Sequence, residues 1–165
     1  MRYYVMIAMG FILSIVLFGC SSAKGLTKEE KAAKEALLKQ AVEKREFVVK
    51  VDRMLPLNGR SQVLTSPYSL EISGDRVKSY LPYFGRAYSV PYGGGEGLSF
   101  ESAITDYTSA VDSKGKTTVE FQARTKEDRH SFRIEIFPGG SASINVTSVN
   151  RQAISFRGSA SAKGE

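Results

Sequence analysis

The chain has 165 residues, of which 42% are hydrophobic, and it contains one cysteine and one histidine. A chain of this length fits a single domain with a core of its own. The formal net charge is +6, but the basic residues are spread along the chain, so a nucleic-acid-binding protein is not expected. The positive excess favours contact with anionic surfaces such as lipid head groups or acidic polymers.

The first twenty residues have the pattern of an export signal. Arg2 supplies a positive charge, residues 5–18 form an apolar run of about 14 residues, and the small Gly19 precedes Cys20. This arrangement resembles a bacterial lipobox, where the chain is cut before the cysteine and the cysteine is lipidated. The alternatives are an ordinary secretory signal with an incidental cysteine, or a transmembrane anchor, which needs about 20 apolar residues.

Lipidation of Cys20 has two consequences. Several acyl chains hold a protein firmly to a membrane, and the thiol is no longer available for a disulfide. Ser21 is similar to the outer-membrane default of the lipoprotein sorting rule, and residues 22–25 lack an acidic cluster of the kind used for surface export. We therefore expect attachment to the outer membrane, facing the periplasm.

A helix is expected over residues 28–45, after a short tether at 20–26. Thr27 and Glu30 have the spacing of a capping box, in which each side chain satisfies a free backbone amide of the first turn. The apolar positions fall on one narrow stripe. This stripe predicts a helix that packs on one side of a sheet or acts as a stalk. Its members are Ala33, Leu37, Leu38 and Ala41.

From Phe47 onward apolar residues recur at every second position, which indicates strands. Turn sequences separate them, and strands joined by short turns pair antiparallel. The expected fold class is α+β: an N-terminal helix followed by a curved antiparallel β-meander, sandwich-like or open-barrel-like. The expected strands are 47–52, 68–72, 77–81, 104–111, 116–124, 132–136, 142–146 and 154–156.

This pattern divides the chain into four parts. Residues 1–19 are the signal peptide, 20–26 the lipid-anchored tether, 27–158 a single domain, and 159–165 a small, polar tail expected to be flexible.

The least ordinary stretch lies between residues 79 and 92. Pro82 and Pro91 interrupt any strand ladder, and aromatic residues recur too densely for a plain solvent loop. One interpretation, which we favour, is that the aromatic side chains cover one end of the sheet. The other is an exposed platform that binds a glycan or a peptide. Its candidate residues are Tyr80, Tyr83, Phe84, Arg86, Tyr88 and Tyr92.

Several short motifs belong together with this stretch. Gly74-Asp75 precedes it, Leu98-Ser99-Phe100 follows it, and residues 81–88 read LPYFGRAY. With Asn150-Arg151 and residues 154–158 (ISFRG), they resemble the bacterial lipoprotein family catalogued as domain of unknown function 4251, found mainly in Bacteroidetes. The resemblance covers residues 47–158. It implies a secreted or lipid-anchored domain of unknown activity and transfers no catalytic or ligand residue.

Residues with catalytic or metal-binding chemistry are scarce. A histidine-based triad would have to use His130, which stands at the start of a predicted strand beside a charged turn, and we expect it to be an exposed strand-edge residue. One histidine without a free thiol speaks against a zinc site. We therefore expect no catalytic residues, no metal and no cofactor.

These observations favour a non-enzymatic envelope lipoprotein, held to the membrane through Cys20, that has a structural role or binds an envelope protein or a glycan polymer. One alternative is a hydrolase of envelope polymers that uses the carboxylates of Glu101 and Asp106. A second is a small-lipid carrier with a cavity inside a barrel, which an interior filled by Phe121 and Phe132 would exclude. The sequence leaves the oligomeric state open.

Overall fold

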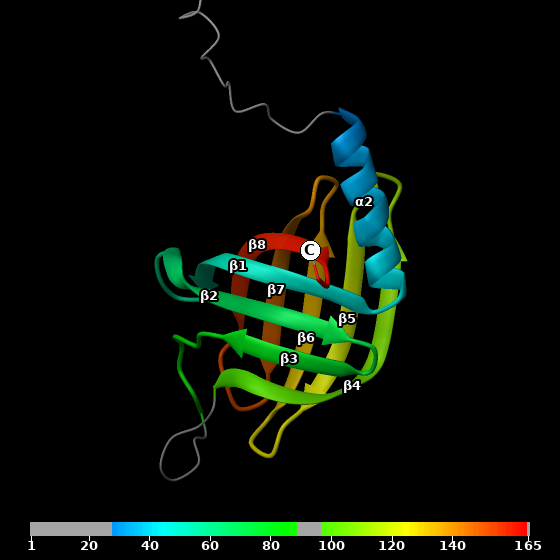
Figure 1. The fold of residues 1–165 in the computed structure, drawn as a ribbon. Helices are drawn as coiled ribbons and strands as arrows, with labels where there is room; N and C mark the ends of the chain where they lie inside the picture. Colours follow the sequence, from blue (N-terminus) through cyan, green and yellow to red (C-terminus); the bar gives the residue numbers. More distant parts are fainter. Residues whose placement is uncertain (1–27, 89–96, 165) are drawn as a thin grey trace, which may run out of the picture.

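The computed structural model describes residues 28–88 and 97–164. These residues form one helix and eight strands that close into a barrel (Figure 1). The predicted lipobox, tether and capping residue Thr27 lie outside the described residues. In chain order the elements are α2 (Lys28–Glu43), β1 (Glu46–Pro56), β2 (Gln62–Ser73), β3 (Arg76–Leu81), β4 (Leu98–Val111), β5 (Thr117–Arg124), β6 (Arg129–Ile136), β7 (Ser141–Ser148) and β8 (Ile154–Ala162).

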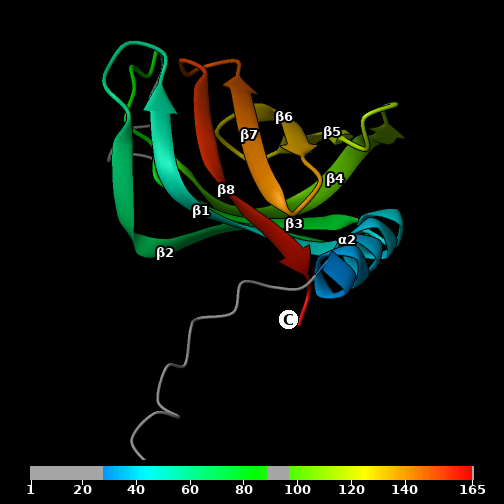
Figure 2. The ribbon, with the colours of Figure 1, turned by 90° about the horizontal axis from the view of Figure 1, so that it is seen from above.

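The strands follow one another around the barrel in chain order, each antiparallel to its neighbours (Figure 2). The antiparallel meander is thus confirmed, but the ring is closed rather than open or sandwich-like, because β8 pairs with β1. This pairing extends to Phe47 and Ala162, so residues 159–162 belong to a strand and not to the expected tail. Closure gives both β1 and β8 a partner on each side, which removes the edges at which other chains could add.

Two bulges mark the corners of the barrel. In Figure 1, β1–β3 cross in front of β5–β7 at a steep angle. β4 connects the two groups by pairing with β3 and β5, and β1 is connected to the second group through β8, which pairs with both β1 and β7. The pairing of β1 shifts between Val51 and Arg53, and that of β4 shifts between Thr105 and Thr108. An extra residue bends a strand and increases its twist, so each bulge lets one long strand turn from the first group into the second.

Apolar side chains fill the interior of the barrel. The strands alternate between buried and exposed residues, as β6 and β7 show most clearly. Phe121 and Phe132 stack at a centroid distance of 4.9 Å, and both are almost fully buried. Ile134 and Ile144 are buried beside them. The volume that a lipid carrier leaves open is therefore occupied by side chains.

Helix α2 packs on the barrel with its second half only. Leu38, Ala41 and Val42 are buried, whereas Ala33 is exposed and Leu37 is 54% exposed. The predicted stripe is therefore correct for Leu38 and Ala41 and wrong for the other two, because the first turns extend beyond the barrel wall (Figure 1). Within the described ranges, no helix has the length and apolar character that crossing a membrane requires.

Two side chains fix the C-terminal end of α2. The Tyr107 hydroxyl, from the bulged part of β4, donates to the Val42 carbonyl at 3.2 Å. Arg45 takes a left-handed backbone (φ 57°), which ends the helix two residues before the predicted position. Its guanidinium lies 4.3 Å from the Tyr107 ring centre and 2.8 Å from the Asp75 carboxylate. The helix thus closes the end of the barrel where the β4–β5 and β6–β7 turns lie.

Replacing Gly158 by alanine is expected to destabilise the barrel strongly. A Cβ atom at this position would collide with the Lys50 carbonyl and lie 2.7 Å from the Val51 Cα atom, and backbone atoms in a closed seam cannot move aside. We expect a loss of about 3 kcal/mol or more in the free energy of unfolding, measured by urea denaturation. Ser159, the next residue on the same strand, is exposed. Ser159→Ala should therefore change the free energy of unfolding by less than about 0.5 kcal/mol. Equal effects of the two substitutions would contradict the steric argument.

Candidate functional site

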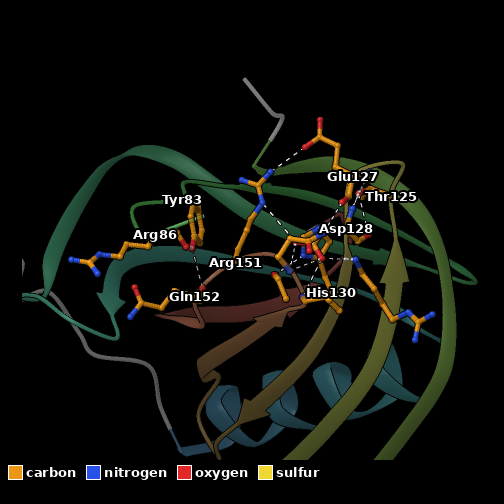
Figure 3. Close-up of polar contacts among 12 residues, drawn as sticks. Tyr83, Arg86, Thr125, Glu127, Asp128, His130, Arg151 and Gln152 are labelled. Carbon is orange, nitrogen blue, oxygen red and sulfur yellow. Dashed lines mark hydrogen bonds and ion pairs between the residues drawn. The ribbon is translucent and has the colours of Figure 1, made fainter. Parts of the chain in front are cut away.

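The barrel end opposite α2 is organised around Arg151, in the connection between β7 and β8 (Figure 3). Its side chain is only 6% exposed, with one terminal nitrogen 3.0 Å from the Glu127 carboxylate. Its Nε atom lies 3.8 Å from Asp128 Oδ2 and has no hydrogen-bond partner among the described residues. A buried guanidinium is tolerated only beside compensating charge, so Arg151 and the two carboxylates stabilise one another's positions.

Asp128 joins two separate turns at this end. Its Oδ1 atom accepts hydrogen bonds from the backbone amides of Arg129 at 2.8 Å and Val149 at 3.1 Å. The backbone amide of Asn150 lies 3.2 Å from each of the two carboxylate oxygens. The hydroxyl oxygen of Thr125 accepts the Asp128 amide at 3.0 Å, which tightens the β5–β6 turn. The turn is thereby tied to the β7–β8 connection that carries Arg151.

The aromatic segment after β3 is attached to the same connection. Ala87 and Arg151 form an antiparallel bridge. On either side of it the Tyr88 amide donates to the Asn150 carbonyl at 2.8 Å, and the Gln152 amide donates to the Arg86 carbonyl at 3.0 Å. Two segments more than 60 residues apart in sequence, both belonging to the family-like motifs, therefore lie side by side.

Tyr83 anchors this segment. Its hydroxyl lies 2.8 Å from the Arg86 carbonyl and 3.1 Å from the Gln152 carbonyl, and its ring centre is 5.5 Å from the Arg151 guanidinium. Burial raises the pKa of the Tyr83 hydroxyl, which keeps it protonated as a donor. A Cβ atom at Gly85 would lie 2.7 Å from that hydroxyl, so the chain curls closely around the ring. For Tyr83 the covering interpretation applies.

The neighbouring side chains point to solvent instead. Tyr80 is 48% exposed, Phe84 58% and Tyr88 72%, and Arg86 is also exposed. Tyr92 lies outside the described residues. The segment is therefore divided: Tyr83 covers the barrel end, whereas the aromatic side chains beside it in sequence are exposed and available for contact.

His130 is not the exposed strand-edge residue that the sequence suggested. It is 1% exposed, because the alternation of β6 turns it into the barrel beside Phe132. Its ring stacks on Phe100 at 4.9 Å, and Nδ1 lies 2.8 Å from the Ser148 hydroxyl. A catalytic histidine and a nucleophilic serine need a contact of this kind. Here, however, the imidazole is buried, so a substrate in solvent does not reach it.

The carboxylates considered for hydrolysis are not brought together. Glu101 is paired with Arg76 at 2.8 Å on the outer face of β4, and Asp106 occupies the bulge with a left-handed backbone (φ 55°). The two residues are five positions apart along the strand, a distance on the order of 15 Å, beyond the roughly 5–10 Å of glycosidase pairs. Across the described part of the chain, no three acidic, histidine or cysteine side chains are grouped to hold a metal ion.

The burial of Arg151 is the feature that sequence reasoning missed. Periodicity reports burial only within helices and strands, and Arg151 lies in a connection. Two signals were available in the sequence: Asn150-Arg151 belongs to the family-like motifs, and Glu127-Asp128 offers two adjacent carboxylates in a turn. Nothing in their spacing indicates that these turns meet.

The imidazole of His130 should titrate below its usual range. Burial lowers its pKa from 6.5, and the nearby Asp128 only partly opposes this. The unfolded chain therefore binds the proton more readily than the folded chain, so stability falls as pH drops below 6.5 towards the folded pKa. Because the chain has one histidine, a single NMR imidazole titration measures this pKa. A value of 6.5 or above would contradict the buried environment.

Known proteins give the fold and the family of the chain. It is similar to the crystal structure of a DUF4251 family protein from Bacteroides eggerthii, with a TM-score of 0.62, 16% identity, and coverage of 80% of this chain and 91% of that chain. At this identity the likeness concerns the fold alone. No curated protein matches. The family model described as "Domain of unknown function (DUF4251)" matches residues 29–160, the barrel with its helix, and the chain therefore belongs to this family.

Proposed function

We propose that the chain is a non-enzymatic glycan-binding domain, held at the periplasmic face of the outer membrane by a lipidated Cys20. The observation that carries the proposal is the exposed aromatic surface of Tyr80, Phe84 and Tyr88, on a backbone fixed by buried contacts. These contacts restrain the backbone of residues 83–88 within the protein itself.

Fixed aromatic residues suit a sugar ligand. The flat apolar face of an aromatic ring packs against the apolar face of a sugar ring, while a tyrosine hydroxyl or the Arg86 guanidinium hydrogen-bonds to its hydroxyls. The bridge between Ala87 and Arg151 and the Tyr83 anchor already restrain the backbone. Binding then orders few additional groups, which reduces its entropic cost.

The other two functions receive less support. A lipid carrier needs an open interior, whereas Phe121, Phe132 and their neighbours fill this one. A carboxylate-based hydrolase needs two acidic groups at working distance, whereas Glu101 and Asp106 are separated along β4. The proposed anchor agrees with the lipobox-like sequence, and the net charge of +6 agrees with a partner that carries negative charge.

Phe84→Ala and Tyr88→Ala should weaken glycan binding without unfolding the domain. Each removes a ring that is mostly in solvent, so the melting temperature should stay within a few degrees. On a microarray of neutral and acidic oligosaccharides, followed by calorimetry, we expect about tenfold weaker binding for each, or about 1.4 kcal/mol.

Tyr83→Ala is the matched control from the same segment. It removes the hydroxyl held by two carbonyls and the ring beside Arg151, and it should lower stability by about 2–4 kcal/mol. Full binding by the Phe84 and Tyr88 variants, or no glycan binding by the unmodified protein, would overturn the proposed function.

Cys20→Ser should abolish lipidation of the protein. Serine cannot form the thioether, so metabolic labelling with an alkyne fatty acid should mark the unmodified chain and leave the variant unlabelled. Ser21→Ala keeps the cysteine and serves as the control. Labelling of the Cys20→Ser chain would contradict lipidation at this residue.

A further inference from the structure

Two arginines face each other at the end of the β5–β6 hairpin. Arg124 and Arg129 are direct cross-strand partners, both exposed on the outer face of the barrel. Neither guanidinium forms an ion pair with any residue in 28–88 or 97–164. Like charges directly opposite one another destabilise a strand pair, so an anion between them would relieve an unfavourable contact.

The facing arginines line a groove made of three adjoining hollows. They border a hollow of about 430 Å³ that also includes Asp106 and Gln122. Asp106 and Gln122 also line a larger hollow of about 530 Å³ over the outer faces of β4–β7. Both arginines also line a third hollow, of about 360 Å³, which follows the β5–β6 turn as far as Asn150. Because they share these lining residues, the three hollows adjoin one another and form one path over the outer face of the barrel.

The chemistry of the path suits a glycan chain. Gln122, Asn145 and Thr147 project outward into the large hollow and offer carboxamide and hydroxyl groups. No described residue forms a hydrogen bond with the carboxamide of Gln122 or Asn145, so both remain available to a ligand. A polymer rich in hydroxyl groups can satisfy such donors and acceptors.

The path also reaches the aromatic surface. Asn150 lines the third hollow, and its carbonyl accepts the backbone amide of Tyr88 at 2.8 Å. A chain bound along the groove can therefore continue to Tyr88 and its neighbours. The exposed Lys126 lies in the same turn and adds a third cation beside the facing arginines.

We propose that Arg124 and Arg129 form a subsite for the carboxylate of an acidic sugar, within a glycan that extends from the aromatic surface along this groove. The inference rests on the proposed glycan-binding function and specifies its substrate class as an anionic, uronic-acid-type polysaccharide. Guanidinium groups bind carboxylates through paired hydrogen bonds, and two of them on adjacent strands select a charged sugar over a neutral one.

The chain offers a matched control for this site. Arg53 and Arg157 are also cross-strand partners and are also exposed, on β1 and β8. They line none of the three hollows. Arg53→Gln with Arg157→Gln removes the same charge as Arg124→Gln with Arg129→Gln, but outside the groove.

The test measures the affinity of the full chain for oligogalacturonate and for a neutral malto-oligosaccharide of equal length. We expect the unmodified protein and the Arg53/Arg157 control to prefer the acidic ligand at least about tenfold. The Arg124/Arg129 variant should lose this preference and keep its melting temperature or raise it, because a repulsion is removed. Added salt should weaken the binding of the acidic ligand more than the binding of the neutral ligand.

The outcomes separate the two proposals. Three results would overturn the acidic-sugar subsite. The first is an equal loss of affinity for the acidic ligand in both arginine variants, and the second is no preference for that ligand in the unmodified protein. The third is that inorganic phosphate displaces the bound acidic ligand as efficiently as galacturonate does. If neutral sugar still binds through Tyr88, the proposed function stands without it. If binding of the acidic ligand requires the two arginines but Tyr88→Ala leaves the affinity unchanged, the acidic-sugar subsite stands and the proposed aromatic site is wrong. Absence of binding to either ligand overturns both.

Discussion

Closure of the strand ring at the seam between β1 and β8 is the constraint on which the rest of the structure depends. At this seam the backbones approach so closely beside Gly158 that no side chain fits between them. With the ring closed, every strand is paired on both sides, and the inward side chains form one filled core. Irregular chain can then gather only at the two barrel ends. One end receives α2, and the other is organised by Arg151.

The buried guanidinium explains why the second end has a defined shape. A buried ion pair is weak evidence for stability, since removing two charges from water costs about as much as their attraction returns. Its effect is positional. Arg151 needs Glu127 and Asp128 beside it, and Asp128 needs the amides of Val149 and Asn150. These requirements select one arrangement of two turns, and the aromatic segment is held against it through its bridge and Tyr83.

This arrangement separates two tasks within one short stretch of sequence. Tyr83 turns inward and supports the chain, while Phe84 and Tyr88 remain in solvent. The proposed glycan site uses the exposed rings, and the proposed acidic-sugar subsite uses side chains that the strand period turns outward on β5 and β6. Both proposals place recognition on the outside of the barrel, because the inside is full. The closed core thus serves as a rigid support for a surface.

Local pattern was enough to predict most of the elements. The alternation from Phe47 onward and the short turns predicted antiparallel strands in the observed order, and Leu38 and Ala41 predicted the helix face. Side-chain period depends on neighbours in sequence, so it is readable without the fold. The barrel closure, the inward turn of His130, the burial of Arg151 and the different exposure of Tyr83 and Tyr88 were decided only by tertiary structure. Each depends on which distant segments meet, and a contact between residues 83 and 152 leaves no trace in the period of either segment.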